Sequence, residues 1–179
     1  MGDTDQDLVA RVRAGDSGAF RPLVERHAPG VFRLACRMTG ETDAEDVVQE
    51  TFLRAFRQLD KYESRSSFGT WIHRIAANLC FDLLRVRARR RAPALDDVRE
   101  PACPAPRPDR IAIATQARAG VLEALDGLTV RERAAFLLRH WEGFGIDRIA
   151  EVLEISETAA KNTVFRAVRK MRASLAGRF

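Results

Sequence analysis

A basic stretch near the middle of the chain, residues 67–91, carries side chains suited to binding nucleic acid. Its apolar residues recur at intervals of three and four, which predicts a helix with one core-facing stripe. The opposite side is predicted to expose one line of residues, namely Trp71, Arg74, Asn78, Asp82 and Arg85. An indole can stack on a base, and amide and guanidinium groups donate to base edges and phosphates. A plain surface helix whose basic end complements its dipole is the alternative interpretation.

A second set of charged residues precedes this stretch. Residues 41–50 contain five acids and no base. They overlap the start of a helix predicted over residues 43–59. Its buried stripe is expected to hold Val48, Phe52, Ala55, Phe56 and Leu59. Its outer face would carry Asp46, Gln49, Glu50, Leu53 and Arg57. Such a face fits a basic protein partner. Two alternatives stay open: the first acids only complement the helix dipole, or Asp43, Glu45, Asp46 and Glu50 bind a metal in a nuclease.

The C-terminal part has the layout of a helix-turn-helix. A short helix from Ile146 is followed by a turn at residues 154–156 and by a second helix, which Ser156 is expected to cap. That second helix is predicted to point polar and basic residues outward, namely Thr158, Lys161, Asn162, Arg166 and Arg169. Such groups can read base edges from the major groove. Phe165 would contact a thymine methyl or pack on its own domain.

The composition and the distribution of prolines predict an all-α chain of two small helical domains joined by a flexible, Pro-rich linker. The chain has 179 residues, 46% of them hydrophobic, and a net charge of +5. Five of its seven prolines lie between Pro93 and Pro108, where no helix can continue. We therefore expect domains at 1–91 and 109–179, with a linker at 92–108.

Several function classes find no support in the sequence. It contains no GxxxxGK[ST] motif, and its three cysteines and three histidines show no metal-ligand spacing. We therefore expect no catalytic residue, no metal and no cofactor. The polar N-terminus is no signal peptide, and no apolar run approaches the ~20 residues of a membrane span. These features predict a cytoplasmic protein.

Taken together, these motifs resemble one known family. The segments DAEDVVQETFLRAFRQL, SFGTWIHRIAANLCFDLLR, LTVRERAAFLLRHWEGF and FRAVRKMR occur in this order. They resemble the extracytoplasmic-function (ECF) sigma factors of bacterial RNA polymerase over nearly the whole chain. The resemblance implies a subunit that directs core polymerase to promoters and starts DNA opening. It also implies control by an anti-sigma factor.

The resemblance gives each segment a role. The acidic helix would dock on the β′ clamp helices through Asp43, Glu45, Asp46, Gln49, Glu50 and Leu53. The following loop and helix would capture a flipped base and melt the minus-ten element. The residues expected there are Tyr62, Ser64, Arg65, Ser66, Ser67, Phe68, Trp71, Arg74, Asn78, Arg85, Arg87, Arg89 and Arg90. We place base capture in residues 62–68, because Trp71 could instead be buried between helices.

The C-terminal domain would read the minus-thirty-five element as duplex and also rest on the β flap. Its expected DNA contacts are Thr158, Lys161, Asn162, Phe165, Arg166 and Arg169. Lys161, Asn162 and Arg166 are the leading readers, while Arg169, Lys170 and Arg172 are expected on phosphates. A free-standing helix-turn-helix regulator is the rival interpretation, although it leaves the acidic helix unexplained.

The chain departs from the family pattern in the helix-turn-helix. The turn often carries glycine where this chain has Glu154, and the second helix often begins with valine where this chain has Ala160. Because glutamate tolerates a left-handed backbone less well than glycine, we expect a turn of different shape.

Overall fold

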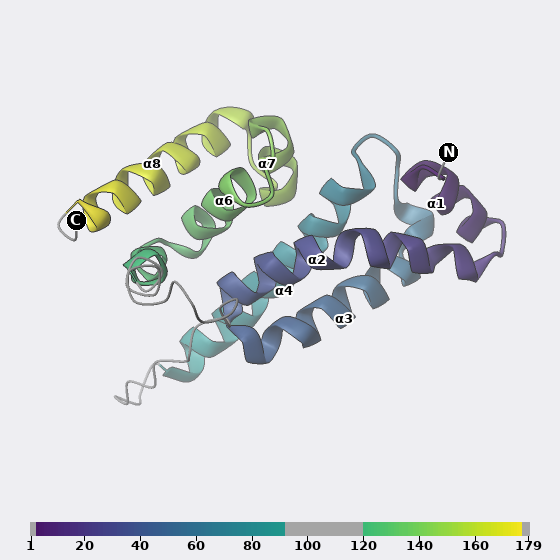
Figure 1. Ribbon diagram of the computed structural model, residues 1–179, viewed down its shortest axis with the longest axis horizontal. Helices are drawn as coiled ribbons and strands as arrows, with labels where there is room; N and C mark the ends of the chain where they lie inside the picture. Colours follow the sequence, from purple (N-terminus) through teal and green to yellow (C-terminus); the bar gives the residue numbers. More distant parts are fainter. Residues whose placement is uncertain (1–2, 92–119, 177–179) are drawn as a thin grey trace, which may run out of the picture. The chain divides into compact units, whose positions relative to one another are not determined.

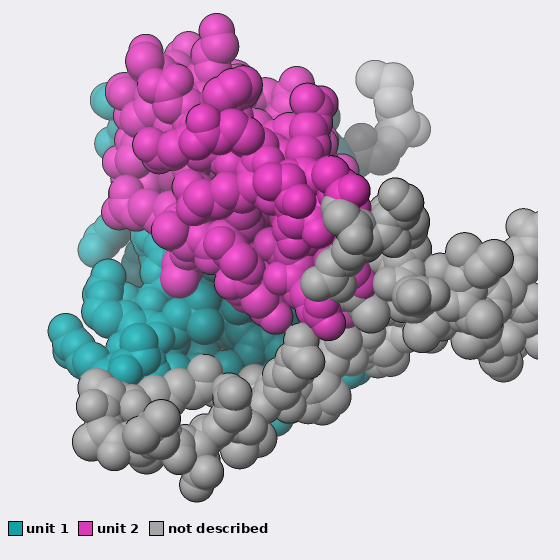
Figure 2. Space-filling view, turned by 90° about the vertical axis from the view of Figure 1, so that its left-hand side faces the viewer, with its two compact units in different colours: residues 1–98 teal, residues 99–179 magenta. Residues whose placement is uncertain are grey.

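The computed structural model describes residues 3–91 and 120–176, which belong to two compact helical units. The units comprise residues 1–98 and 99–179, coloured apart in Figure 2. All regular elements of the described residues are helices, which confirms the predicted fold class. The predicted linker at 92–108 and the first residues of the predicted second domain, 109–119, lie outside the described residues. None of the described helices is both long and apolar enough to cross a bilayer.

Residues 3–91, the described part of the first unit, contain four α-helices and two short 3-10 helices. In chain order they are α1 (Asp5–Arg13), η1 (Ser17–Ala19), α2 (Phe20–Thr39), α3 (Glu41–Arg57), η2 (Leu59–Lys61) and α4 (Phe68–Arg91). Thr4 starts α1 with a capping box, since its hydroxyl accepts from Asp7 N and the Asp7 carboxylate accepts from Thr4 N. Gly40, at φ 94°, separates α2 from α3. Pro29 lies inside α2 without ending it.

Helices α2, α3 and α4 pack on one another and enclose the core of the first unit, while α1 packs on α2 (Figure 1). Leu23, Val31, Leu34 and Ile72 are almost fully buried there.

The buried face of α3 differs from the predicted stripe. Val47 and Thr51 are buried, whereas Phe56 is 44% exposed and Val48 is half-buried. Thr51 can be buried because its hydroxyl donates to Val47 O at 2.6 Å, within its own helix. A polar residue that was not part of the predicted stripe therefore belongs to the core.

The second unit is a helix-turn-helix supported by further helices. Its elements are the helical residues 120–126, α6 (Val130–His140), α7 (Ile146–Leu153) and α8 (Glu157–Leu175). The three labelled helices pack pairwise around Leu137, Leu138, Ile149, Val152 and Met171. Ser156 caps α8, as predicted, by accepting from Ala159 N at 3.2 Å.

Glu154 adopts the left-handed conformation that glycine usually supplies, with φ 54° and ψ 48°. Ile155 N donates to Ala150 O at 3.0 Å and Glu154 N to Glu151 O at 3.4 Å, the pattern of a Schellman motif. The expected change of turn shape is therefore wrong. The backbone keeps a glycine-type turn and Glu154 bears the strain.

Replacing Glu154 with glycine is expected to raise the free energy of unfolding of the second unit by about 1 kcal/mol, because the left-handed penalty disappears. Urea unfolding followed by Trp141 fluorescence, with Trp71→Phe in both proteins, measures the difference. A lower stability of Glu154→Gly would show that the side chain makes a contact worth more than the strain.

Candidate nucleic-acid and polymerase interfaces

The outer face of α3 combines carboxylates with apolar surface. Glu45, Asp46 and Gln49 are exposed, and Leu53 is 41% exposed. Glu50 is half-buried and accepts from Arg54 Nε at 2.6 Å along the same helix. This face offers unburied anionic groups next to an aliphatic side chain, which is what a basic protein surface with an apolar centre would contact.

Asp43 and Arg87, predicted for two different partners, contact each other. They form an ion pair whose side chains are only 22% and 28% exposed, and Arg87 also donates to Thr39 O at 2.8 Å. This cluster ties the first turn of α3 to the last turns of α4 and to the end of α2. Both residues therefore have a structural role in the first unit, which the sequence pattern did not reveal.

Trp71 is not on an exposed line, so this part of the prediction is wrong. Its side chain is 6% exposed and packs against Tyr62 and Phe68, with ring centroids at 5.1 and 5.7 Å. Tyr62 and Phe68 are themselves buried, 5.8 Å apart between centroids. The three rings form an aromatic floor beneath the 62–68 loop.

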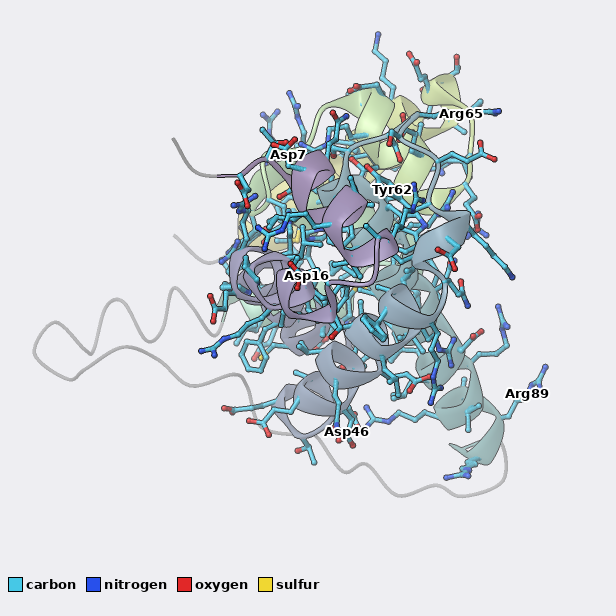
Figure 3. The ribbon with its side chains drawn as sticks, turned by 90° about the vertical axis from the view of Figure 1, so that its right-hand side faces the viewer. Asp7, Asp16, Asp46, Tyr62, Arg65 and Arg89 are labelled. Carbon is cyan, nitrogen blue, oxygen red and sulfur yellow. The ribbon has the colours of Figure 1, made fainter. Side chains whose placement is uncertain are left out.

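The exposed part of this loop is its tip. Glu63, Ser64 and Arg65 are exposed, and the tip is closed by the Tyr62 hydroxyl donating to Ser66 O at 2.8 Å. Ser67 Oγ accepts from Thr70 N at 3.1 Å, at the start of α4. Figure 3 shows the Arg65 side chain projecting from one end of the unit, with Asp46 and Arg89 toward the other.

A hollow of about 400 Å³ lies beside the aromatic floor. The residues that line it come from α1 and its cap, from α2 and from the loop: Thr4, Asp5, Gln6, Arg26, Tyr62, Ser67 and Phe68. Aromatic edges together with amide, hydroxyl and guanidinium groups are the types of group that hold a flat, hydrogen-bonding ligand. Burial, followed by the nearby Asp5 carboxylate, raises the pKa of the Tyr62 hydroxyl, whereas Arg13 lowers it.

The rest of the outer line of α4 is accessible. Asn78, Arg85, Arg89 and Arg90 are exposed, and Arg74 is half-buried. Arg85 Nη1 contacts Asp82 Oδ1 at 3.1 Å on the helix surface, a pair that solvent screens. The helix therefore presents cationic groups from its middle to its C-terminal end.

The outward face of α8 is as predicted. All six residues predicted to face DNA are exposed, namely Thr158, Lys161, Asn162, Phe165, Arg166 and Arg169. Phe165 is 66% exposed and so does not pack into its own domain. Lys170, predicted on phosphate, instead donates to Glu132 Oε2 at 2.7 Å.

Glu132 is a buried acid that the sequence reading did not single out. It completes the capping box of α6 with Thr129, and Arg166 Nε lies 3.7 Å from its Oε1. Burial acts to raise the pKa of Glu132, but the hydrogen bonds from Lys170 and Thr129 outweigh it and the pKa lies below its ordinary value. The T-x-x-E spacing at residues 129–132 was a local signal for the cap. Nothing local indicated the contact with α8.

Replacing Glu132 with glutamine is expected to lower the free energy of unfolding of the second unit by about 2 kcal/mol at pH 7, because charge-assisted hydrogen bonds are lost. Since the folded-state pKa lies below the unfolded value, this contribution is present above the unfolded pKa and disappears as pH falls through the folded one. Urea unfolding from pH 7 to pH 3 measures it. A difference between the two proteins that does not shrink as pH falls from 7 to 3 would contradict the ionic origin.

The metal alternative gains nothing from the structure. Within residues 3–91 and 120–176, no group of three His, Cys, Asp or Glu side chains could hold a metal ion. Asp43, which the nuclease interpretation needs, faces Arg87.

An acidic helix face, an exposed loop followed by a basic helix, and a helix-turn-helix in the second unit are the features of a promoter-recognition factor of the sigma-70 class. The sequence profile of Sigma-70 region 2 matches residues 23–90, and that of Sigma-70 region 4 matches residues 118–171. The first match lies within the first unit, beginning after α1, and the second match lies within the second unit.

Individual relatives and a solved structure support the same class of protein. The chain is 32% identical over 173 residues to the ECF RNA polymerase sigma-E factor of Haemophilus influenzae, covering 92% of this chain and 91% of that protein. It is 36% identical over 167 residues to the ECF sigma factor SigE of Mycolicibacterium smegmatis, covering 90% of this chain and 65% of that longer protein. The solved structure of CnrH in complex with the cytosolic domain of CnrY matches with a TM-score of 0.75 at 29% identity, covering 99% and 100% of the two chains.

The chain therefore belongs to the ECF RNA polymerase sigma factors. The match of residues 23–90 to region 2 excludes the rival interpretation of a free-standing helix-turn-helix regulator.

Proposed function

We propose that the two units of this sigma factor divide promoter recognition between them. The first unit binds core polymerase and opens DNA at the minus-ten element, and the second reads the minus-thirty-five element as duplex. The observation that carries this division is the separation of surfaces: the first unit has an acidic face and a cationic one, whereas the exposed face of α8 is polar and basic.

The docking surface is the outer face of α3. Its proposed contacts with the polymerase clamp are Glu45, Asp46, Gln49, Glu50 and Leu53. Asp43 supports this surface from within, because its carboxylate is held by Arg87. The match to region 2 supports docking through this unit.

The minus-ten surface is proposed to be the loop tip, the adjoining hollow and the outer line of α4. Extruding a base costs a few kcal/mol, which binding must offset in a factor with no nucleotide-hydrolysis motif. Stacking contributes about 1–3 kcal/mol per base, and phosphate neutralisation adds a salt-dependent term. Ser64, Arg65 and Ser66 would hold the base, while Tyr62, Phe68 and Trp71 support the loop from below.

The cationic line of α4 then holds the opened strand. Its proposed members are Arg74, Asn78, Arg85, Arg89 and Arg90. In the second unit the proposed readers are Lys161, Asn162 and Arg166, assisted by Thr158, Phe165 and Arg169. A contact of this unit with the β flap stays a prediction.

An anti-sigma factor is also proposed as a partner. CnrH, which matches nearly the whole chain, was solved in complex with the cytosolic domain of CnrY. A protein of that kind would cover the acidic or cationic surfaces and keep the factor from polymerase. Catalysis by the chain itself is not proposed, and the factor acts where RNA polymerase acts.

Run-off transcription on a promoter library with core polymerase tests the proposal. In a separate purification, the full chain should co-elute with core polymerase. The promoters selected by transcription should share two sequence elements, an upstream one that is read as duplex and a downstream one that is opened. Failure to co-elute would overturn the docking assignment, and transcripts without a shared upstream element would overturn the role of α8.

A further inference from the structure

Helix α1 lies outside both family matches, since the region 2 match begins at residue 23 and α1 ends at Arg13. It nevertheless contacts the proposed minus-ten loop. Arg13 Nη2 donates to Leu59 O at 2.7 Å and to Asp60 O at 3.4 Å, and it also donates to Tyr62 O. One guanidinium thus holds the carbonyl groups of residues 59, 60 and 62, where η2 passes into the loop.

The guanidinium of Arg13 gives these carbonyl oxygens a charged hydrogen-bond donor. Leu59 O also accepts from Tyr62 N at 3.1 Å, and a carbonyl oxygen has two lone pairs, so it can accept from both groups. A cation at the end of a helical turn interacts favourably with such carbonyls. The side chains of Leu59 and Tyr62 are both 3% exposed. The start of the loop is therefore fixed from two sides, by apolar packing of its side chains and by Arg13 on its backbone.

The other end of α1 is anchored as well, next to the hollow. Asp5 pairs with Arg26 of α2, and its Oδ2 lies 2.8 Å from His27 Nε2. Asp5 and Gln6 line the hollow together with Tyr62 and Phe68. The same short helix thus lines the hollow through Asp5 and Gln6 and, through Arg13, holds the backbone of the loop that also lines it.

We infer that Arg13 is a positioning residue for minus-ten recognition, holding the 62–68 loop in the conformation that captures a base. This inference rests on the proposed role of that loop. The physical reason is preorganisation: a loop whose stem is already fixed loses less conformational freedom when it binds DNA. Arg13 acts through the loop backbone and need not contact DNA.

The test uses the full chain in holoenzyme on a promoter selected by the wild-type protein. Arg13→Ala should slow opening about tenfold, measured by 2-aminopurine fluorescence in the minus-ten region, and leave core affinity within twofold. Discrimination between preferred and substituted minus-ten bases should also fall, which a general loss of folded protein would not cause. Arg13→Lys should restore part of the effect, since an ammonium keeps the charge but not the fork of donors.

Arg11→Ala is the matched control. Arg11 lies on the same helix and pairs only at the surface, with Asp3 and Asp16 at 2.7 Å each. It should open DNA at the wild-type rate. Amide hydrogen exchange gives a local readout, because exchange at residues 62–66 should accelerate in Arg13→Ala while the amides of α3 and α4 stay protected.

The outcomes separate the inference from the proposed function. If Arg13→Ala and Arg65→Ala, at the loop tip, both leave opening and base discrimination unchanged, the proposed role of the loop fails and the inference fails with it. If Arg65→Ala impairs opening and Arg13→Ala does not, only the inference is overturned. If Arg13→Ala lowers the salt dependence of DNA binding by about one phosphate contact without changing base discrimination, Arg13 binds phosphate and does not position the loop.

Discussion

Asp46→Lys is expected to weaken binding to core RNA polymerase by about 10- to 100-fold, or about 1.4–2.8 kcal/mol. Asp46 is exposed on the outer face of α3, beyond the first helical turn, so its reversal should leave folding unchanged. A lysine there would place an ammonium against a partner surface that we propose to be basic. Titration of labelled protein with core polymerase at low salt measures the change, which should shrink as salt is raised.

Glu25→Lys is the matched control for this prediction. It makes the same change of charge on α2, at a residue paired with Arg21 on the exposed surface at 2.7 Å. Core affinity of this variant should stay within twofold of wild type. If both variants weaken binding equally, the effect is one of net charge. If Asp46→Lys binds as tightly as the wild-type protein, α3 is not the docking surface.

The neighbouring residues separate the contributions to docking. Leu53→Ala removes the exposed aliphatic contact without changing charge, and its effect should be independent of salt. Glu50→Lys is harder to interpret, because it also releases Arg54 from its ion pair. Asp46 is therefore the cleaner probe of the electrostatic part.

Periodicity predicted the helices and the outward face of α8, because those features depend on residues close in the chain. The spacing of three and four residues decides which side of an amphipathic helix meets a core. Thr158, Lys161 and Asn162 were placed correctly for this reason, and so was the cap at Ser156.

The contacts of charged residues that the sequence did not reveal join residues distant in the chain. Arg87 meets Asp43 across 44 positions, and Arg13 meets Leu59 across 46. Neither pair has a sequence signal, since a charged residue looks the same whether its partner is a phosphate or a carboxylate of its own domain. Trp71 was misplaced because it lies at the edge of the apolar stripe, where the folding back of the loop decides its burial.

A count of cations therefore overstates the DNA-binding surface. Arg13, Arg87 and Lys170 all make polar contacts within their own unit. Exposure does not separate these cations from DNA contacts, since Arg13 and Lys170 are exposed and Arg166 also lies 3.7 Å from Glu132. Substitution of a cation that holds backbone carbonyls, such as Arg13 or Arg87, should change local structure first.

The second large effect is expected on α8, where Lys161→Ala should cost about 1–3 kcal/mol of binding to the preferred minus-thirty-five element. Lys161 is exposed near the N-terminal end of the recognition helix, the part that approaches base edges in a helix-turn-helix. An ammonium there can donate to guanine O6 and N7. Because the lost contact is to a base, binding to a sequence altered at that position should change little, so specificity relaxes.

Arg172→Ala separates base reading from phosphate binding on the same helix. Arg172 is exposed and follows Lys161 by three helical turns on nearly the same face, about 16 Å along the axis. Its loss should weaken binding to all sequences alike and lower the salt slope by about one. Holoenzyme binding to promoters altered at each upstream position, over a range of salt, measures both variants. If Lys161→Ala behaves as Arg172→Ala does, Lys161 contacts phosphate, and base reading belongs to Asn162 and Arg166.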